Sequence, residues 1–142
     1  MKFLGIGNDI IEISRIEKAV SKEIFIKKIY TEKEIEYIKS KGNRAETYAG
    51  KFSAKEAVSK ALGTGVRNFS PADIEILNDT LGKPYVVFRN SIEEFNDIYQ
   101  CDISISHCKE YAAAVAVIFK KWFLGENYGY FRIKKRISGI QR

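Results

Sequence analysis

The sequence predicts a single α+β domain in which an antiparallel sheet packs with helices. Residues 52–65 carry apolar side chains at helical spacing and end in glycines, which is typical of a helix and its termination. Residues 74–77 and 85–88 are apolar segments on the two sides of a turn, which predicts a hairpin and hence antiparallel strands. A length of 142 residues with 45% hydrophobic and 30% charged residues indicates one ordered domain with its own core.

The first twenty residues are predicted to form a strand followed by a helix. Residues 3–7 are apolar and contain two glycines, which indicates a strand that passes close to another element. The strand ends at Asn8 and Asp9, and an aspartate at such a boundary is commonly a turn or capping residue. Ser14 is placed to cap a helix that begins at Arg15.

Two more helices are predicted before the central one. Residues 23–30 are amphipathic, with isoleucine and aromatic side chains on one face and lysines on the other. Thr31 and Glu34 fit a capping box, in which each side chain accepts a hydrogen bond from the other's backbone, at the start of a helix that ends near Ser40. A helix that starts at residue 45 or 46 continues into the central stretch.

The second half of the chain is predicted to supply most of the strands. After the hairpin, Ser91 is placed to cap a short helix over residues 92–99. Residues 102–107 alternate between polar and apolar side chains, as in a strand with one exposed face. Residues 111–119 are rich in alanine and valine, which predicts a strand that is buried on both faces.

The central helix carries the first candidate functional residues. Glu56 and Lys60 project from the same face, one turn apart, beside a glycine turn that a ligand can approach closely. On spacing alone, such a pair is more often a solvated ion pair than a site. Asp9 adds a second carboxylate, and two carboxylates together with a ligand's phosphates suit Mg²⁺. His107, the single histidine, is equally consistent with a hydrogen-bonded edge residue and with a ligand contact.

Composition and charge narrow the classes of protein to which the chain can belong. No apolar run approaches the roughly 20 residues of a membrane span, and the N-terminus lacks the pattern of a signal peptide, so we expect a cytoplasmic protein. Cys101 and Cys108 do not have the spacing of a zinc site and are expected to remain thiols. Residues 120–142 carry seven basic residues against one acidic residue, which accounts for the whole net charge of +6.

Six segments, taken together, carry a resemblance to a known family. They are Gly5–Ile16, Lys51–Ala57, Lys60–Gly65, Gly82–Pro84, and Ile103–His107 with Glu110–Ala114. In the order and the residues of these segments, the chain resembles the holo-acyl-carrier-protein synthases, the small 4'-phosphopantetheinyl transferases, over residues 3 to about 119. The resemblance implies a phosphopantetheinyl transferase domain over residues 1–119. Family members usually end soon after the last of these residues, whereas this chain continues with a basic, aromatic C-terminal extension over residues 120–142.

The family's chemistry is implied by this resemblance. It is a magnesium-dependent transfer of the phosphopantetheine arm from coenzyme A to a serine of apo acyl carrier protein, with release of adenosine 3',5'-bisphosphate, in fatty acid biosynthesis. Asp9 and Glu56 match the family's metal-binding acids, and Lys60 matches the lysine near the transferred phosphate, with donation of a proton to the leaving group as a hypothesis. Two catalytic roles stay open for Glu56: metal ligand only, or ligand that also orients a magnesium-bound water acting as the base.

The resemblance also implies contacts to both substrates and to other copies of the chain. The residues that match the family's coenzyme A contacts are Lys51, Lys60, Lys83, Pro84, Ser106 and His107. Arg15 matches a contact to the acidic carrier protein, and Lys18 and Lys22 extend the same face, although a solvated helix surface has the same pattern. The family is typically a homotrimer with active sites at subunit boundaries.

Two other functions compete with this interpretation. The basic, aromatic extension fits a nucleic-acid-binding module, which would show salt-sensitive binding to polyanions without magnesium or coenzyme A. A different nucleotide-dependent transferase fits the carboxylates, but the chain has neither GxxxxGK[ST] nor GxGxxG. The same aromatic and basic residues could bind an anionic membrane surface or the carrier protein. We favour packing of residues 122–131 as a hairpin, with a loose end after Lys134, and we expect nucleic acid not to be the partner.

Overall fold

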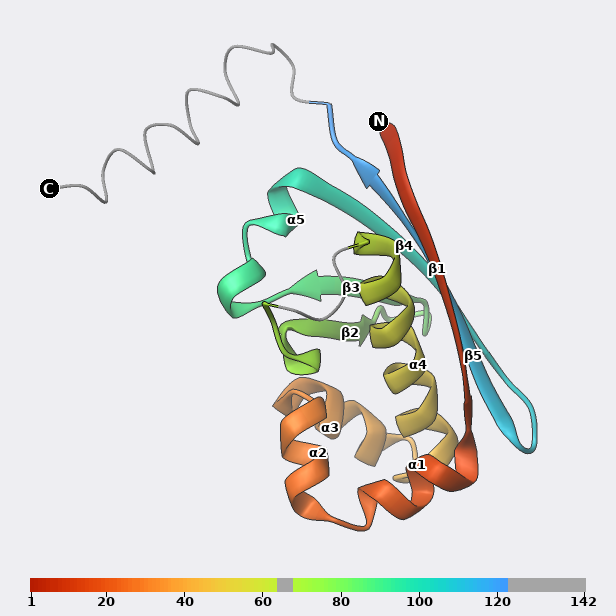
Figure 1. Cartoon of the computed structure of the whole chain (residues 1–142). Coiled ribbons are helices and arrows are strands. Elements are labelled where there is room, and N and C mark those ends of the chain that lie inside the picture. The colour runs from red at the N-terminus through yellow and green to blue at the C-terminus, as the bar shows by residue number, and fades with distance from the viewer. Residues whose placement is uncertain (64–67, 123–142) are drawn as a thin grey trace, which may run out of the picture.

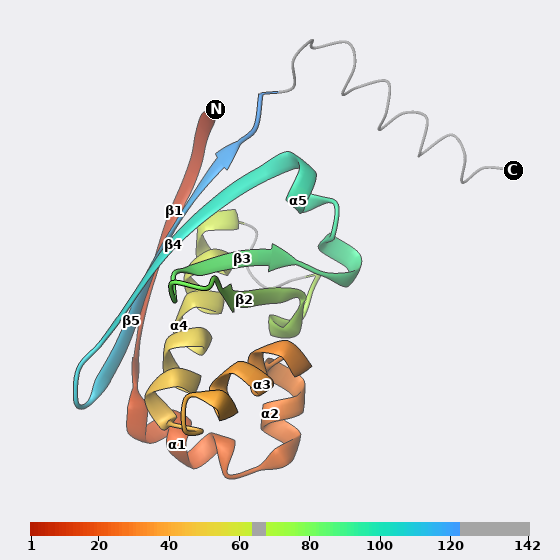
Figure 2. The ribbon, with the colours of Figure 1, turned by 180° about the vertical axis from the view of Figure 1, so that it is seen from behind.

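The chain folds around a long helix, α4 (Ala45–Leu62), that packs against a three-stranded antiparallel sheet in the computed structural model (Figure 1). The structure describes residues 1–63 and 68–122. A two-stranded hairpin lies on the side of α4 that faces the viewer in Figure 2. The predicted α+β class with antiparallel strands is confirmed. The elements other than α4 are β1 (Lys2–Glu12), α1 (Ile13–Val20), α2 (Glu23–Ile29), α3 (Glu32–Ser40), β2 (Ile74–Asn78), β3 (Pro84–Phe88), α5 (Phe95–Ile98), β4 (Tyr99–His107), β5 (Tyr111–Lys120), and 3-10 turns over Pro71–Asp73 and Asn90–Ile92.

The strand order of the sheet is β1-β5-β4, so β1 pairs with a strand that lies about a hundred residues later in the chain. Asp9 pairs with Ala114, and Ala114 pairs with Ile105 on the other side. Along β5 the burial alternates, because α4 covers one face of the sheet only. The prediction that residues 111–119 are buried on both faces is therefore wrong for the single chain, in which Val115 remains 36% exposed.

β1 lies directly on α4 because two glycines of the strand face the helix. A Cβ at Gly7 would lie 2.0 Å from the carbonyl oxygen of Ala57, and one at Gly5 would lie 2.2 Å from that of Ala61. Any side chain larger than hydrogen would push the strand off the helix backbone. The glycines therefore set how close Asp9 comes to the residues of α4.

α4 is buried around most of its circumference rather than along one stripe. Ala54 and Val58 are buried as the spacing predicts, but Lys51, Lys55 and Ser59 are also buried. The single-stripe prediction is wrong because the sheet covers one side of the helix while the hairpin and α1–α3 cover others. The helix ends as predicted at Gly63, whose φ of 73° is left-handed, and Gly65 lies outside the described residues.

A buried ion pair ties α3 to α4. Lys55 Nζ donates to Glu34 Oε1 at 2.7 Å and to the carbonyls of Pro71 and Ile74. Glu34 also completes the capping box with Thr31, which confirms that prediction. Because both charged groups are hydrogen-bonded, the pair is compensated in the interior and fixes the position of α3 against α4.

Two predicted helix starts differ in the structure. β1 runs on to Glu12, and α1 begins at Ile13 without a side-chain cap, so the prediction that Ser14 caps it is wrong. The helix predicted over residues 92–99 shrinks to a 3-10 turn and the four-residue α5. The cause is Asn96, whose side chain bonds both the N–H and the carbonyl of Phe88 and so ties this segment to the end of β3.

Three further predictions concern membrane-spanning segments, the two cysteine thiols and the C-terminal extension. Within residues 1–63 and 68–122, no helix is both long enough and apolar enough to span a bilayer. Cys101 and Cys108 are free thiols, as predicted. Trp122 is 72% exposed, and the rest of the predicted hairpin and loose end lies outside the described residues.

Candidate active site

β1 and α4 bring together three of the predicted site residues, Asp9, Glu56 and Lys60. Asp9 is on the face of β1 that carries Gly5 and Gly7, which is the face against α4. Lys60 Nζ donates to the carbonyl oxygen of Asn8 at 2.9 Å and lies 3.4 Å from Asp9 Oδ1. Glu56 precedes Lys60 by one helical turn, so a second carboxylate enters the same site.

The two carboxylates repel each other in a partly dehydrated setting. The Asp9 side chain is 15% exposed, and its Oδ2 is buried without a hydrogen-bond partner among the described residues. Burial raises the pKa of Glu56, the charge of Asp9 raises it further, and the Lys60 ammonium opposes both effects. The Lys60 contact relieves only part of this repulsion, so the site favours an additional cation.

This donor set fits Mg²⁺ with part of its coordination shell left open. Carboxylate oxygens are hard ligands, and the unpartnered Asp9 Oδ2 is free to bind a cation. No group of three His, Cys, Asp or Glu residues in residues 1–63 and 68–122 is arranged to hold a metal. Water or a substrate's phosphates would have to supply the other ligands, which is how Mg²⁺ is commonly bound.

Ser53 holds the backbone of Asp9 against α4, a role that our sequence analysis missed. Its hydroxyl donates to the carbonyl oxygen of Asp9 at 3.1 Å, and Ser53 itself is fully buried. Together with Lys60, Ser53 attaches two consecutive carbonyls of β1 to one helix. A serine inside a helix gives no signal of such a contact, because its partner is far away in the sequence.

The predicted coenzyme A contacts lie on two further parts of the fold. Lys83 precedes β3 and is exposed, and Pro84 begins β3 opposite Asn78. Ser106 and His107 end β4 and are exposed. Lys51, in contrast, is 3% exposed, and burial lowers its pKa to about 8.

Within one chain, the sheet separates Ser106 from the carboxylates. Ile105 faces α4, since its Cγ2 would lie 3.1 Å from a Cβ at Gly50. Side chains alternate along a strand, so Ser106 points to the opposite face, whereas Asp9 faces α4. β5 lies between their strands, which places β1 and β4 about 10 Å apart. A single chain therefore does not bring these two residues to one site.

The predicted carrier-protein contacts lie on α1, which follows β1 directly. Arg15 and Lys18 are exposed and line a shallow depression together with Ser14 and Glu17. The buried residues Ile13 and Ile16 pack the other side of α1 into the core. Lys22, the residue before α2, is also exposed, so all three basic side chains lie on the surface over residues 15–22.

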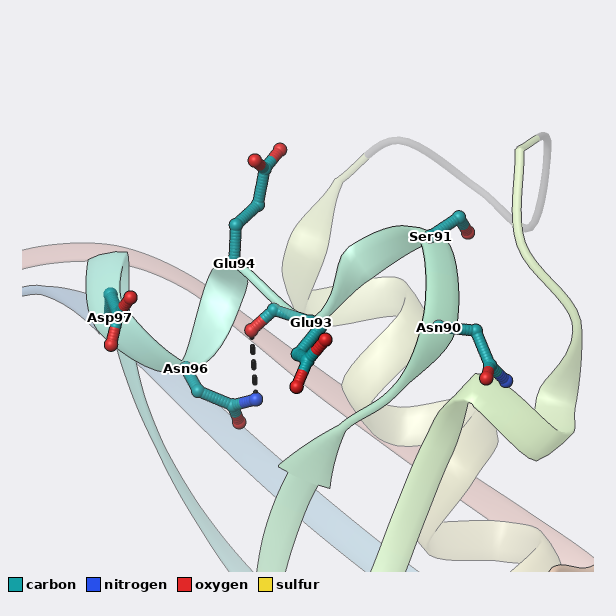
Figure 3. A pocket seen from close by; sticks show the side chains of 6 residues that line it. All are labelled: Asn90, Ser91, Glu93, Glu94, Asn96 and Asp97. Carbon is teal, nitrogen blue, oxygen red and sulfur yellow. Dashed lines mark hydrogen bonds between the residues drawn. The ribbon is translucent and has the colours of Figure 1, made fainter. Parts of the chain in front are cut away.

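A separate hollow is lined by the segment that connects β3 to β4 in the sequence, and its lining includes none of the predicted site residues. Figure 3 shows its lining, in which the amide of Asn96 donates to the carbonyl oxygen of Glu93 at 2.8 Å. Every lining side chain is polar or acidic, with no lysine, arginine or histidine that would bind a phosphate. The lining residues are Asn90, Ser91, Glu93, Glu94, Asn96 and Asp97.

Comparisons with known proteins agree with this geometry. The family model described as the 4'-phosphopantetheinyl transferase superfamily matches residues 5–116. A protein of Fusobacterium nucleatum subsp. nucleatum named holo-[acyl-carrier-protein] synthase is 63% identical over 119 residues, which cover 81% of this chain and 98% of that protein.

Solved structures of the same name share the fold. The holo-(acyl-carrier-protein) synthase of Bacillus anthracis, in complex with CoA (3',5'-ADP), superimposes with a TM-score of 0.72 at 39% identity, covering 86% of this chain and all of that one. The synthase of Neisseria meningitidis superimposes with a TM-score of 0.76 at 31% identity, covering 83% of this chain and 99% of that one.

Proposed function

This chain belongs to the 4'-phosphopantetheinyl transferase superfamily, among the holo-[acyl-carrier-protein] synthases, and we propose that it moves the 4'-phosphopantetheine group of coenzyme A to a serine of apo acyl carrier protein. The proposal includes a requirement for Mg²⁺, release of adenosine 3',5'-bisphosphate and a place in fatty acid biosynthesis. The observation that carries it is the convergence of Asp9, Glu56 and Lys60 on one side of α4.

In this reaction the serine oxygen attacks the phosphorus that bears pantetheine, and the pyrophosphate bond to the adenosine bisphosphate breaks. Asp9 and Glu56 would hold Mg²⁺, which supplies positive charge for the phosphoryl oxygens when bound. Lys60 adds a second positive charge where negative charge develops on the departing bisphosphate. Both roles stay part of the proposal for Glu56: a carboxylate that would only hold the metal, or one that would also orient a water for removal of the serine proton.

Substrate contacts complete the proposal. Lys83 and His107 suit the phosphates of the nucleotide, and Pro84 and Ser106 lie beside them in the sequence. The exposed cations Arg15, Lys18 and Lys22 of the α1 surface suit an acidic helix of the carrier protein. We place the reaction in the cytoplasm, where the two free cysteines are expected to stay reduced.

We also propose a homotrimer in which neighbouring chains complete the site. Among residues 1–63 and 68–122, nothing covers one face of the sheet, and this face is apolar along β1 and β5. Because Ser106 shares that face while Asp9 does not, a second chain packed there would bring its own site residues to the first. The exposed apolar residues of β1 and β5 are Phe3, Leu4, Ile6, Ile10, Tyr111 and Val115.

Replacing Ile6 with lysine is expected to dissociate the trimer without unfolding the chain. Ile6 is 63% exposed in the single chain, so its removal costs no core packing, whereas a charge at a subunit interface is unpaired and buried. Analytical ultracentrifugation should show a monomer with unchanged circular dichroism and little activity. Ile24→Lys is the matched control, since Ile24 on α2 is 80% exposed, and it should remain a trimer. A trimeric Ile6→Lys variant would remove this sheet face from the interface.

The mass of the carrier protein tests the transfer directly. After incubation with coenzyme A and Mg²⁺, the apo carrier should gain the mass of one phosphopantetheine, and excess EDTA should abolish the gain. A carrier of unchanged mass would contradict the proposed function. A protein that instead bound oligonucleotides in a salt-sensitive way, with no response to coenzyme A, would favour the nucleic-acid alternative.

Replacing Lys60 with methionine is expected to lower kcat by about 10²-fold, with a smaller effect on the Kd of coenzyme A. The reason is that Lys60 is 56% exposed and placed to meet charge that develops during the reaction, rather than charge already present in the bound substrate. Steady-state kinetics and calorimetry measure the two quantities. Lys27→Met, on α2 and 72% exposed, serves as the control. An unchanged kcat would remove Lys60 from the mechanism.

A further inference from the structure

Lys51 is directed into the protein although the family resemblance assigns it to coenzyme A. Its Nζ donates to the carbonyl oxygen of Ile76 at 2.5 Å and to Asn78 Oδ1 at 2.9 Å. The same nitrogen lies 4.6 Å from the centre of the Tyr37 ring. An ammonium has three N–H donors, and two hydrogen bonds with one aromatic face occupy them. Lys51 therefore has no donor left for a phosphate.

The contacts of Lys51 continue to the turn between β2 and β3. Asn78, which accepts from Lys51, donates through its Nδ2 to the carbonyl oxygen of Gly82 at 3.0 Å. The backbone N–H groups of Leu81 and Lys83 both donate to Asp79 Oδ1 at 2.9 Å. One chain of hydrogen bonds thus runs from α4 through Asn78 to the turn.

The turn itself is exposed, and besides these bonds it is closed by two backbone hydrogen bonds, from the N–H of Asp79 to the carbonyl oxygen of Lys83 and from the N–H of Gly82 to that of Asp79. Leu81 is 93% exposed, and Gly82 has a φ of 87° with no atom within 4 Å of a Cβ placed there. A turn without packing is ordered only by its hydrogen bonds. Lys51 orients the side-chain amide of Asn78. The buried ammonium can only donate, so the oxygen of the amide must point to Lys51 and its nitrogen must point to the turn.

We propose that Lys51 is a positioning residue, which acts through Asn78 to hold the 79–83 turn in the shape that presents Lys83 and Pro84 to coenzyme A. This inference rests on the proposed function, since it takes the turn as part of the coenzyme A site. In place of a direct contact between Lys51 and coenzyme A, the proposal gives Lys51 an indirect role through the turn. The helix that carries Glu56 and Lys60 would then also set the shape of the turn.

Coenzyme A binding to three variants tests the proposal. Lys51→Met keeps the length of the side chain and loses the donors, and Asn78→Ala breaks the same chain of bonds at its next member. Lys41→Met is the matched control, because Lys41 lies 5.6 Å from the same Tyr37 ring but is exposed and has no contact with the turn. The Kd is measured by calorimetry with coenzyme A and with the analogue that lacks the 3'-phosphate, and amide exchange reports on Leu81 and Lys83.

The expected result is a Kd raised about tenfold in Lys51→Met and Asn78→Ala, with kcat at saturating coenzyme A nearly unchanged. The loss should be equal for the two nucleotides, because Lys51 touches no phosphate. The double variant should bind coenzyme A no more weakly than either single variant, since both substitutions break the same chain of hydrogen bonds. Exchange at Leu81 and Lys83 should rise in these variants and stay at the wild-type rate in Lys41→Met.

A loss that appears with coenzyme A and disappears without the 3'-phosphate would overturn the proposal, because it would show that Lys51 binds this phosphate directly. Wild-type exchange in the turn of both variants would overturn it as well. If Lys51→Met does not fold, Asn78→Ala alone decides, since Asn78 is only half-buried. A wild-type protein that binds no coenzyme A would instead refute the proposed function, and the exchange measurements would still decide the relay.

Discussion

Replacing Glu56 with glutamine is expected to lower the transfer rate on the order of 10³-fold and, at the same time, to stabilise the metal-free protein. An amide keeps the shape of the side chain but removes one of the two negative charges that suit a divalent cation. The thermal shift that Mg²⁺ produces in the wild type should disappear. Metal-free melting curves and the rate of carrier modification measure the two effects.

The gain in stability should depend on pH. Because the folded-state pKa of Glu56 is raised, its favourable contribution is complete below the ordinary pKa of a glutamate and is lost as the pH rises through the folded-state value. The neutral amide has no such loss, so the excess Tm of Glu56→Gln should be small at pH 4 and larger at pH 7. Glu36→Gln, an exposed position on α3 away from the site, is the control and should keep the wild-type transfer rate. Equal activity of Glu56→Gln and the wild type would exclude Glu56 from the mechanism.

Replacing Gly7 with alanine is expected to destabilise the fold by about 4 kcal/mol or to prevent folding. The new methyl group would lie 2.0 Å from the carbonyl oxygen of Ala57 and 2.7 Å from the backbone nitrogen of Ala61. Neither atom can move without breaking the helix, so β1 must shift, and Asp9 shifts with it. Denaturant unfolding measures the loss, and a folded fraction should bind Mg²⁺ more weakly.

Gly82→Ala separates steric overlap from backbone strain. Gly82 has a left-handed φ of 87°, but no atom lies within 4 Å of the position of its Cβ. We expect a loss of about 1 kcal/mol, which is the cost of that conformation for alanine. If Gly7→Ala cost no more than Gly82→Ala, β1 would not be held against α4 by contact between backbones.

Local sequence signals were sufficient where the structure is local. The capping box of Thr31 and Glu34 depends on residues three apart, and the hairpin depends on the turn between its strands. Long-range contacts left no such signal. Glu34 is paired with Lys55, twenty-one residues away, and a sequence gives no reason to bury either charge.

The candidate site shows the same division. That Asp9 and Glu56 belong together came from the resemblance to a family, because spacing alone favoured a solvated pair. Ser53 and Asn78 were missed, since Ser53 bonds to Asp9 and Asn78 to Lys51, and both contacts join segments far apart in the sequence. Residues 111–119 were misjudged for another reason: an alanine and valine strand has the same composition whether its second face meets the core or another chain.

The pairing of β1 with β5 has a consequence for the order of events during synthesis. β1 ends at Glu12, and its sheet neighbour within the described part of the chain begins at Tyr111, so roughly a hundred residues must be made before the first strand finds its place. Nascent chains that stop short of β5 would leave Asp9 without a fixed position beside α4. Folding that waits for such distant contacts is slow, and we expect catalytic competence to arise late, after β5 has left the ribosome.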